Sequence, residues 1–555
     1  MTSLIRRISL FTFFLFTFIC PPGLFSMDHK TSDTLEITVG KDKGAGYPSI
    51  QEAINAAPAH ARIRIAPGIY KEDLLITKPV HLAGAGWQNT IIIPKTVWTK
   101  SLEEFNRKME GIMNSQASEE EQKKKIEEML GKYTQPALRI QGADGVEIHD
   151  VKITSYGEKD SGQTFAEAIV ECKTSRVLFS GCIVIGGPRD GIRILDASDV
   201  EVRNTLVAAV LGTGIVAGGR KGGHVKARIL ESDVRNCHYA GIQAGRGNNL
   251  VTVKACRISG AGWHGIRYDD TSPEIIGNLI YKNFRTGIYA SRNTAALVKG
   301  NLFYENESAG MWCLYQNKDT IENNTFASNH WAGLTVSGAA QPIIRRNIFF
   351  DNPRAVYCGN LKDDSPFARF QNLPPIEGNL FWKNDASVVK DKIESDKFTT
   401  EEIRLDEKTG NRSEDPLFKS VEKREFNILP SSPALQNAIG APSLISFDSP
   451  WPLQPEELAI IPDTDTRDSE KWKKPRDKSS QSPTSPTLRI KDLEAGYIRW
   501  LAFLFHKDPE KRIETIRAIA EKGDASFIDD LIRAKSGGSR PGTRYGAGGG
   551  KKISS

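Results

Sequence analysis

The sequence predicts a parallel β-helix, an all-β solenoid in which coils of about 23 residues stack on one another. The first of three observations is a repeated glycine that is always followed by an apolar residue. The steps between these glycines are 23, 27, 24, 22, 23 and 23 residues, and the glycines are Gly191, Gly214, Gly241, Gly265, Gly287, Gly310 and Gly333. A repeat of this length is typical of a solenoid.

The second observation is a pair of polar columns in register with the glycines. Nine residues before each glycine stand Cys182, Thr205, Ser232, Cys256, Asn278, Asn301 and Asn324, continued by Asn347. Four residues before the later glycines stand Asn283, Asn306 and Asn329. Equivalent residues of stacked coils lie ~4.8 Å apart. We therefore expect each asparagine column to be joined amide to amide along the stack.

The third observation is an alternation after each glycine. Positions +1 and +3 are apolar in most coils, as in Ile192 and Ile194, whereas position +2 holds large or polar residues. This pattern predicts a short strand with one buried face. No leucine-rich pattern and no long helical period is present. The glycines should lie where the chain turns into the strand, because a side chain would clash there or because φ is positive.

Composition excludes several classes of function. The 555 residues carry a formal net charge of only +6, so no nucleic-acid or membrane surface is indicated. There is no H-E-x-x-H and no paired C-x-x-C, which argues against a zinc site. We expect the six cysteines after Cys20 to be free core residues, because Cys182 and Cys256 share a column three coils apart, ~14 Å and beyond disulfide reach.

Residues 1–26 have the pattern of a secretory signal. Arg6 and Arg7 precede an apolar run from Ile8 to Ile19, and cleavage is expected after Ser26. We therefore expect an exported protein, periplasmic or extracellular. The alternative is an uncleaved membrane anchor.

A short helix should cover the first coil. Ser49 and Glu52 form a capping box at the start of a helix over 50–57 that has one apolar face. Strands are expected at 62–66, 74–76 and 80–82. The helix would shield the unpaired edge of the solenoid.

Three segments of this region carry a family resemblance: Y-P-S-I-Q-E-A-I-N-A-A-P from Tyr47, A-P-G-I-Y-K-E from Ala66, and L-A-G-A-G from Leu82. They resemble the N-terminal cap of pectinesterases and of other right-handed β-helix proteins. The resemblance implies a right-handed parallel β-helix over residues 35–445. The downstream pectinesterase segments Q-D-T-L and G-x-V-D-F-I-F-G are absent, as are the D-P-H-D of periplasmic alginate epimerases and the catalytic pattern of polygalacturonases, so none of these activities is implied.

Segments outside the repeat complete the domain organisation. Capping boxes at Ser101 and Ser118 predict a helical insertion over 96–135, after which the coils resume at Ala137. Residues 414–441 resemble the closing segment of extracellular β-helix proteins. Residues 446–487 read as a linker, residues 488–536 as a small helical unit that looks like a HEAT-type pair, and residues 537–555 as a disordered tail.

Only outward-facing residues of a packed solenoid can meet a ligand. Aromatic rings beside arginines suit a sugar chain, because apolar ring faces stack and guanidinium pairs with carboxylates. The candidate substrate-binding residues are Arg193, Gln243, Trp263, Tyr289, Trp312 and Tyr357. The alternative is that these are ordinary exposed strand residues.

The densest cluster of reactive side chains runs from Trp263 to Asp270. A polyuronate lyase or epimerase removes the C5 proton with a base and holds the carboxylate with a cation. The candidate catalytic residues are His238, His264, Arg267, Asp269 and Asp270, and Asp269 and Asp270 are also the candidate ligands for Ca²⁺, the one cofactor considered. A glycosidase would need two carboxylates close together. Asp190, three coils from Asp269, is a poor partner for one.

Two functions remain open. One is a β-helix scaffold that binds polysaccharide or a cell-envelope partner on its outer face, with the C-terminal helices as a second docking element. The other is a carbohydrate-active enzyme, lyase-like, epimerase-like or hydrolase-like, that uses the Trp263–Asp270 face. In either case we expect a monomer.

Overall fold

The computed structural model describes most of residues 35–441. The described ranges are 35–40, 46–95, 135–155, 166–187, 189–218, 224–361, 372–394, 397–405 and 407–441, with Phe367, Arg369, Phe370, Ser446, Asp448, Trp451 and scattered residues of 111–125. The signal segment, the HEAT-like unit, the tail and most of the linker and insertion lie outside these residues. Their assignments therefore remain predictions.

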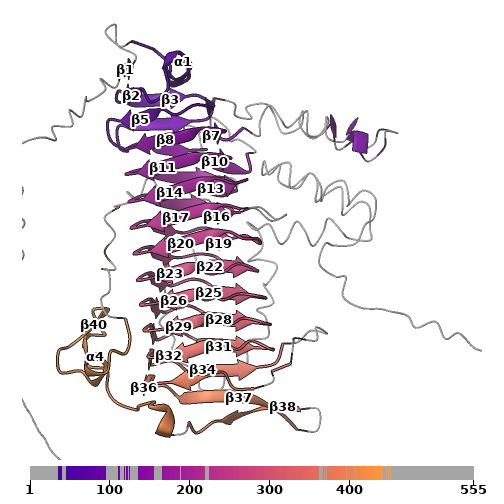
Figure 1. Ribbon diagram of the computed structural model, residues 1–555, viewed down its shortest axis with the longest axis vertical. Coiled ribbons are helices and arrows are strands. Elements are labelled where there is room, and N and C mark those ends of the chain that lie inside the picture. The colour runs from indigo at the N-terminus through magenta and orange to yellow at the C-terminus, as the bar shows by residue number, and fades with distance from the viewer. Residues whose placement is uncertain are drawn as a thin grey trace, which may run out of the picture. The chain divides into compact units, whose positions relative to one another are not determined.

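Three parallel sheets, which we name A, B and C, form the faces of a solenoid whose coils run A, B, C in sequence (Figure 1). Sheet A contains β1 (Glu36–Val39), β2 (Arg62–Ile65), β5 (His81–Gly84), β8 (Asp144–His149), β11 (Arg176–Ser180), β14 (Asp199–Arg203), β17 (Lys226–Leu230), β20 (Leu250–Lys254), β23 (Glu274–Ile276), β26 (Leu297–Lys299), β29 (Thr320–Glu322), β32 (Ile343–Arg345) and β35 (Ile376–Glu377). Sheet B contains β3 (Gly68–Lys71), β6 (Thr90–Ile93), β9 (Lys152–Thr154), β12 (Ile183–Gly187), β15 (Leu206–Val210), β18 (Asp233–Arg235), β21 (Arg257–Ser259), β24 (Leu279–Tyr281), β27 (Leu302–Tyr304), β30 (Thr325–Ala327), β33 (Ile348–Phe350) and β36 (Leu380–Trp382).

Sheet C carries the strands that follow the repeated glycines. It contains β4 (Leu74–Ile76), β7 (Leu138–Gln141), β10 (Ala168–Lys173), β13 (Asp190–Leu195), β16 (Ile215–Ala217), β19 (Ala240–Ala244), β22 (His264–Asp269), β25 (Thr286–Ser291), β28 (Ala309–Leu314), β31 (Ala332–Ser337), β34 (Arg354–Gly359), β37 (Ala386–Glu394) and the antiparallel β38 (Lys397–Glu402). The predicted all-β parallel solenoid is thereby confirmed. No helix among the described residues is long and apolar enough to cross a bilayer.

Both predicted asparagine columns are hydrogen-bonded ladders. In the first, the backbone N–H and the side-chain Nδ2 of Asn301 both donate to Oδ1 of Asn324, each at 2.9 Å, and the pattern continues through Asn347 and Asn379 to Asn411. The second ladder runs through Asn283, Asn306, Asn329, Asn352 and Asn384. The ladders satisfy buried backbone groups at the corners between sheets, where no strand partner exists.

The glycine column is explained by close approach between coils. A Cβ on Gly310 would lie 2.7 Å from the carbonyl oxygen of Gly333 in the next coil and 2.6 Å from Cδ1 of Phe326. The repeated glycines of this column do not have positive φ. Of the two reasons expected for them, steric exclusion is therefore the one that applies.

The interior is apolar and regular. Residues at +1 and +3 point inward, as Ile192 and Ile194 do, both fully buried. Under sheet B, Phe303, Phe326, Phe349 and Phe381 stack with centroid separations of 4.6, 5.0 and 5.3 Å. All six described cysteines are buried and free, as predicted.

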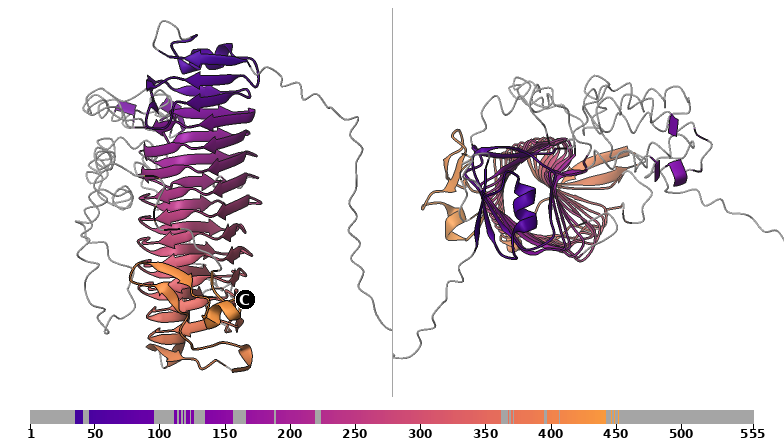
Figure 2. Two further views of the ribbon diagram at one scale, coloured as in Figure 1. Left: turned by 90° about the vertical axis from the view of Figure 1, so that its left-hand side faces the viewer. Right: turned by 90° about the horizontal axis from the view of Figure 1, so that it is seen from above.

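The helix α1 (Ile50–Ala56) lies across the N-terminal end of the solenoid, as predicted for a lid (Figure 2). Ser49 caps it by accepting from the N–H of Glu52. The first turn is also held by Glu72, whose carboxylate accepts from the N–H groups of Ile50 and Gln51, each at 2.8 Å, and from Oγ of Ser49. A carboxylate at a helix N-terminus accepts hydrogen bonds from the N–H groups of the first turn, which have no partner within the helix.

Glu72→Ala should therefore lower the free energy of unfolding by about 2 kcal/mol, because three hydrogen bonds to one carboxylate are lost together. Glu52→Ala is the matched control, since only the backbone of Glu52 is needed for the Ser49 cap. Urea denaturation followed by circular dichroism measures both. Equal losses in the two variants would contradict this role for Glu72.

The closing segment folds back on the outside of sheet B. The hairpin β39 (Phe418–Ser420) and β40 (Glu425–Ile428), with α4 (Pro433–Gln436), packs on its outer face through pairs such as Phe350 with Phe418 (Figure 1). Trp451 is 6% exposed against β12 and β15. Trp451 belongs to the predicted linker 446–487, and its ring is buried against apolar residues of sheet B.

In the insertion, the predicted capping box at Ser118 is present. The N–H of Glu121 donates to Oγ of Ser118, and the N–H of Ser118 donates to the Glu121 carboxylate, both at 3.3 Å. The box at Ser101 lies outside the described residues. A short 3-10 helix, η1 (Glu407–Thr409), precedes Asn411, the last residue of the first asparagine ladder.

Candidate functional site

On the outer face of sheet C, the residues two positions after each repeated glycine line up from coil to coil in one column, which we call a file. Gln243, Arg267, Tyr289, Trp312, Thr335 and Tyr357 are direct register partners on consecutive strands. Their neighbours at +1 and +3, such as Ile266 and Tyr268, are buried, which fixes the outward direction of the file. The register therefore aligns these positions in one column, which is partly exposed at Gln243, Arg267, Tyr289, Trp312 and Tyr357 and buried at Thr335.

A second file runs beside it, at the entrance to the strands. Backbone hydrogen bonds link Tyr239, Trp263, Arg285, Ser308 and Trp331 on consecutive coils. The two files meet over β19, β22 and β25. There Tyr239 and Trp263 lie with ring centroids 4.9 Å apart.

Two arginines stack on these rings. The guanidinium carbon of Arg267 lies 5.6 Å from the ring centroids of both Tyr239 and Tyr289. The guanidinium carbon of Arg285 lies 4.3 Å from the ring of Trp263. We call Tyr239, Trp263, Arg267, Arg285 and Tyr289 the first arginine cluster.

Neither arginine of this cluster makes a salt bridge with a carboxylate among the described residues. Burial lowers the pKa of Arg285, which shows that its cation is partly desolvated. Stacking on an aromatic face offsets part of that cost. The hydrogen-bonding edges of a stacked guanidinium remain available to an anion.

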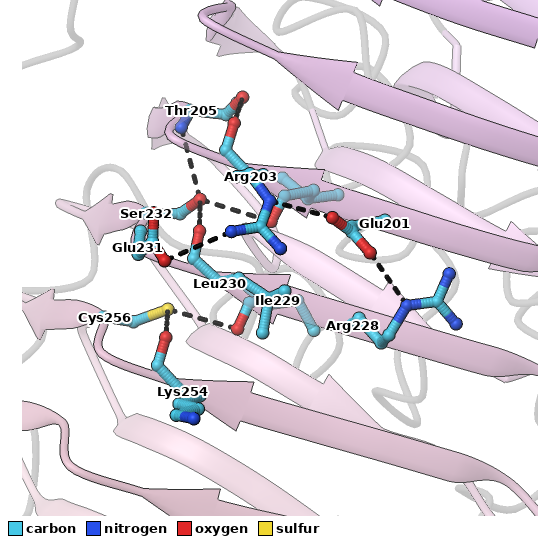
Figure 3. A network of polar contacts seen from close by, with 11 residues as sticks. Glu201, Arg203, Thr205, Arg228, Ile229, Leu230, Glu231, Ser232, Lys254 and Cys256 are labelled. Carbon is cyan, nitrogen blue, oxygen red and sulfur yellow. Dashed lines mark hydrogen bonds and ion pairs between the residues drawn. The ribbon is translucent and has the colours of Figure 1, made fainter. Parts of the chain in front are cut away.

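The arginines of sheet A are arranged differently. Arg228 and Arg203 both donate to Glu201, and Arg203 also donates to Glu231 (Figure 3). Arg228 donates to Asp199 as well, which extends the ion-pair network. Further along the same sheet, Arg345 pairs with Glu322 at 2.7 Å. Arg203, Arg228 and Arg345 are therefore neutralised by carboxylates of the same sheet, whereas the arginines of the first arginine cluster on sheet C make no such pairs with described carboxylates.

Asp269 and Asp270 lie at the end of β22, beside the first arginine cluster. Arg246 reaches both carboxylates, at 3.3 and 3.8 Å, and so does Arg292, at 3.4 and 3.5 Å. Burial raises the pKa of Asp269, and the charge of Asp270 adds to this rise. Two carboxylates that already face two guanidinium groups do not provide the six to eight oxygens that Ca²⁺ takes. Nor do the described residues contain a group of three or more metal-binding side chains.

His264 is placed inward from the site. Its side chain is 4% exposed, its Nδ1 lies 2.6 Å from Oγ1 of Thr286, and its ring stacks on Tyr289 at 4.7 Å. Burial, with a smaller effect of the nearby Arg285 cation, lowers the pKa of His264 to about 3. So weak a base, covered by protein, suits a role in holding the Tyr289 ring. His238 lies on the preceding coil, one position before Tyr239.

Because the folded-state pKa of His264 lies below its unfolded value, the unfolded chain takes up the proton first as pH falls. Stability should therefore decline from about pH 6.5 toward pH 3, by about 2 kcal/mol at pH 5. His264→Gln should flatten this slope, and the exposed His224→Gln should not. Urea denaturation midpoints at pH 7 and pH 5 measure it. An unchanged slope in His264→Gln would contradict the assignment.

The side chains of three further candidates already interact with other residues of the protein. Arg193 pairs with Glu167 and lies 3.7 Å from Asp190. Trp312 donates from Nε1 to Oγ of Ser337 and meets Tyr289 edge to face at 6.0 Å. Tyr357 donates to Asp391 at 2.6 Å. Arg193 therefore belongs to a neutralised cluster, distant from the Trp263–Asp270 face.

Sequence reasoning missed the arginines that surround this face. Arg246 and Arg292 lie in turns between sheets C and A, and the lengths of these turns vary from coil to coil, so no column marks them. Arg354 begins β34, in a coil where Ala355 replaces the repeated glycine. Extending the glycine column to Ala355 would have identified Arg354, the residue just before it.

Comparisons with known proteins found similar solved structures and one matching family model. Among solved structures, similar ones include XylC in complex with xylose (12% identity, 64% of this chain and 84% of that chain, TM-score 0.40) and the Azotobacter vinelandii mannuronan C-5 epimerase AlgE4 A-module (16%, 61% and 83%, TM-score 0.31). Another is the periplasmic alginate epimerase AlgG (14%, 63% and 81%, TM-score 0.38). No curated protein matches the chain. Residues 240–387 match the family described as right handed beta helix region, so this part of the chain is a right-handed β-helix by sequence as well as by structure.

Proposed function

We propose that this protein binds an acidic polysaccharide on the outer face of sheet C. The observation that carries the proposal is the pair Arg267 and Arg285, stacked on aromatic rings and without a salt bridge to a described carboxylate. The guanidinium of Arg285 is partly desolvated, which is costly, and an anionic ligand would reduce that cost. Arg267 is acted on by the charge of Asp269 but makes no salt bridge with it. Uronate carboxylates would pair with the guanidinium edges, while the tyrosine and tryptophan rings hold those edges in place.

The chemistry of the face favours binding over turnover. His264 is buried, and Asp269 and Asp270 face Arg246 and Arg292. A β-elimination or epimerisation is favoured by one observation only, the raised pKa of Asp269 beside Arg267. In that second candidate function Arg267 would hold the substrate carboxylate and Asp269 would exchange the C5 proton.

Calorimetric titration of the full chain with polygalacturonate tests the binding proposal. Arg285→Gln and Arg267→Gln should each weaken binding about ten- to hundredfold, because each removes a charge-assisted hydrogen-bonding group. Arg345→Gln, on sheet A and already paired with Glu322, is the matched control and should leave affinity unchanged. Equal affinity in all four proteins would contradict the proposal. Unsaturated-uronate absorbance that disappears in Asp269→Asn would instead establish the lyase.

Residues 1–26 and the proposed ligand both favour export of the protein. Acidic polysaccharides are found outside the cytoplasm, and the basic and apolar pattern of these residues favours export. Cell fractionation with N-terminal sequencing checks this, and the expected N-terminus is Met27. In the same proposal residues 488–536 dock on an envelope partner, and removal of 485–555 should lose that partner while keeping glycan binding.

A further inference from the structure

A second cluster of the same construction lies further along sheet C, outside the Trp263–Asp270 face. The guanidinium carbon of Arg354 lies 4.1 Å from the ring centroid of Trp331 and 6.0 Å from that of Tyr357. The two rings meet edge to face at 5.7 Å. We call Trp331, Arg354 and Tyr357 the second arginine cluster.

This cluster is rigidly supported. The hydroxyl of Tyr357 donates to Asp391 Oδ1 at 2.6 Å, and Asp391 Oδ2 accepts from the N–H of Asn360 at 2.9 Å. The carboxylate is therefore committed to a hydroxyl and a backbone amide. Arg354, like Arg267 and Arg285, makes no salt bridge with a described carboxylate, and the charge of Asp385 acts on it only from beyond salt-bridge distance.

The two clusters are related by the coil repeat. Trp263, Arg285, Ser308 and Trp331 are joined coil to coil by backbone hydrogen bonds, so Trp331 lies three coils beyond Trp263. An arginine from the following coil stacks on each of the two tryptophans: Arg285 on Trp263, and Arg354 on Trp331. At ~4.8 Å per coil the separation is ~14 Å. Between them, Trp312 lies half-buried in the neighbouring file, the one that contains Arg267 and Tyr289.

We propose that the second arginine cluster is a second anion anchor, so that the site takes a linear polyanion laid along the coil axis and held at both ends of this three-coil interval. The inference rests on the proposed function and adds to it a direction and a minimum length for the ligand. A chain long enough to reach both clusters gains from the second contact as an intramolecular event. A shorter chain binds at the first cluster alone.

The shared chemistry is a regular row of negative groups on a flexible chain. Carboxylates of a polyuronate and sulfate esters of a sulfated glycan both fit a guanidinium edge. Size-defined oligogalacturonates and sulfated oligosaccharides of equal length are therefore the two arms of the test. The arm with the higher affinity identifies the anion.

Calorimetric titration of the full chain with a galacturonate trimer and a decamer tests the second anchor. The decamer should bind wild type at least about tenfold more tightly than the trimer does, since the two anchors act together. Arg354→Gln should reduce decamer affinity toward the trimer value and leave trimer affinity unchanged. Arg285→Gln should weaken both, and Arg345→Gln neither.

The outcomes separate this inference from the function on which it rests. Arg354→Gln that keeps the full preference for the decamer, while Arg285→Gln loses binding, would overturn the second anchor and leave the proposed function intact. Absence of binding by both oligomer classes would overturn both. Thermal unfolding midpoints of each variant within the error of wild type show that a loss is one of contact rather than of fold.

Discussion

Asn324→Ala should lower the free energy of unfolding by about 3–5 kcal/mol, because one substitution leaves several buried polar groups without partners. Oδ1 of Asn324 accepts from the backbone and side chain of Asn301, and its Nδ2 donates to the carbonyl of Val298 and to Asn347. All of these groups lie in the dry interior, so water cannot replace the lost bonds.

The solenoid provides its own control for this substitution. Ser232 occupies the same column in an earlier coil, where its Oγ accepts from the N–H of Thr205 and donates to the carbonyl of Val202. Asn324→Ser should therefore lose less than half of what Asn324→Ala loses. Urea denaturation followed by far-ultraviolet circular dichroism measures both. Equal losses of unfolding free energy in the two variants would mean that side-chain volume, and not hydrogen bonding, determines how much the asparagine ladder stabilises the fold.

Gly310→Ala should cost about 3 kcal/mol, because the new methyl group would overlap a packed interior on three sides. The Cβ would lie 2.6 Å from Phe326, 2.7 Å from the carbonyl of Gly333 and 2.9 Å from Phe303. Relief would require the coils to separate, which breaks the sheet spacing and the phenylalanine stack together.

Gly277→Ala is the matched control for the glycine substitution. Gly277 has a φ of +64°, and nothing lies within 4 Å of its Cβ position, so only backbone strain opposes the methyl group. Other coils place Ala255 and Asn323 in the same left-handed conformation. Gly277→Ala should therefore cost about 1 kcal/mol, measured by the same denaturation experiment. If Gly310→Ala lowers the free energy of unfolding by no more than this, neighbouring coils can move apart more easily than the close contacts at Gly310 imply.

The fold was predictable because each coil repeats the same local constraints. Glycines such as Gly310 and asparagines such as Asn324 recur about once per coil, so their columns locate the corners and strands without any knowledge of long-range contacts. Glu72 could not be assigned in this way, since it caps a helix that begins 22 residues earlier in the chain. The position of Trp451 also depends on contacts with distant coils, which no local pattern records.

The candidate site was predictable in its position but not in its electrostatics. The outward file through Arg267 and Tyr289 follows from strand alternation. Which arginine is neutralised follows only from three-dimensional neighbours, as two cases show: Arg193 pairs with Glu167, whereas Arg285 makes no salt bridge with a described carboxylate. The burial of His264 was missed for a related reason, because its position just before the glycine turns inward beneath Tyr289.

The most direct test compares two ligands with the same sugar backbone, one with free carboxylates and one with methyl esters in their place. The affinity of the wild-type chain for polygalacturonate should exceed its affinity for fully methyl-esterified polygalacturonate of the same length by at least about tenfold, because esterification removes the anion that pairs with Arg267 and Arg285. The preference should shrink as salt is added. Equal affinity for the two polymers would contradict the central claim that this face recognises negative charge.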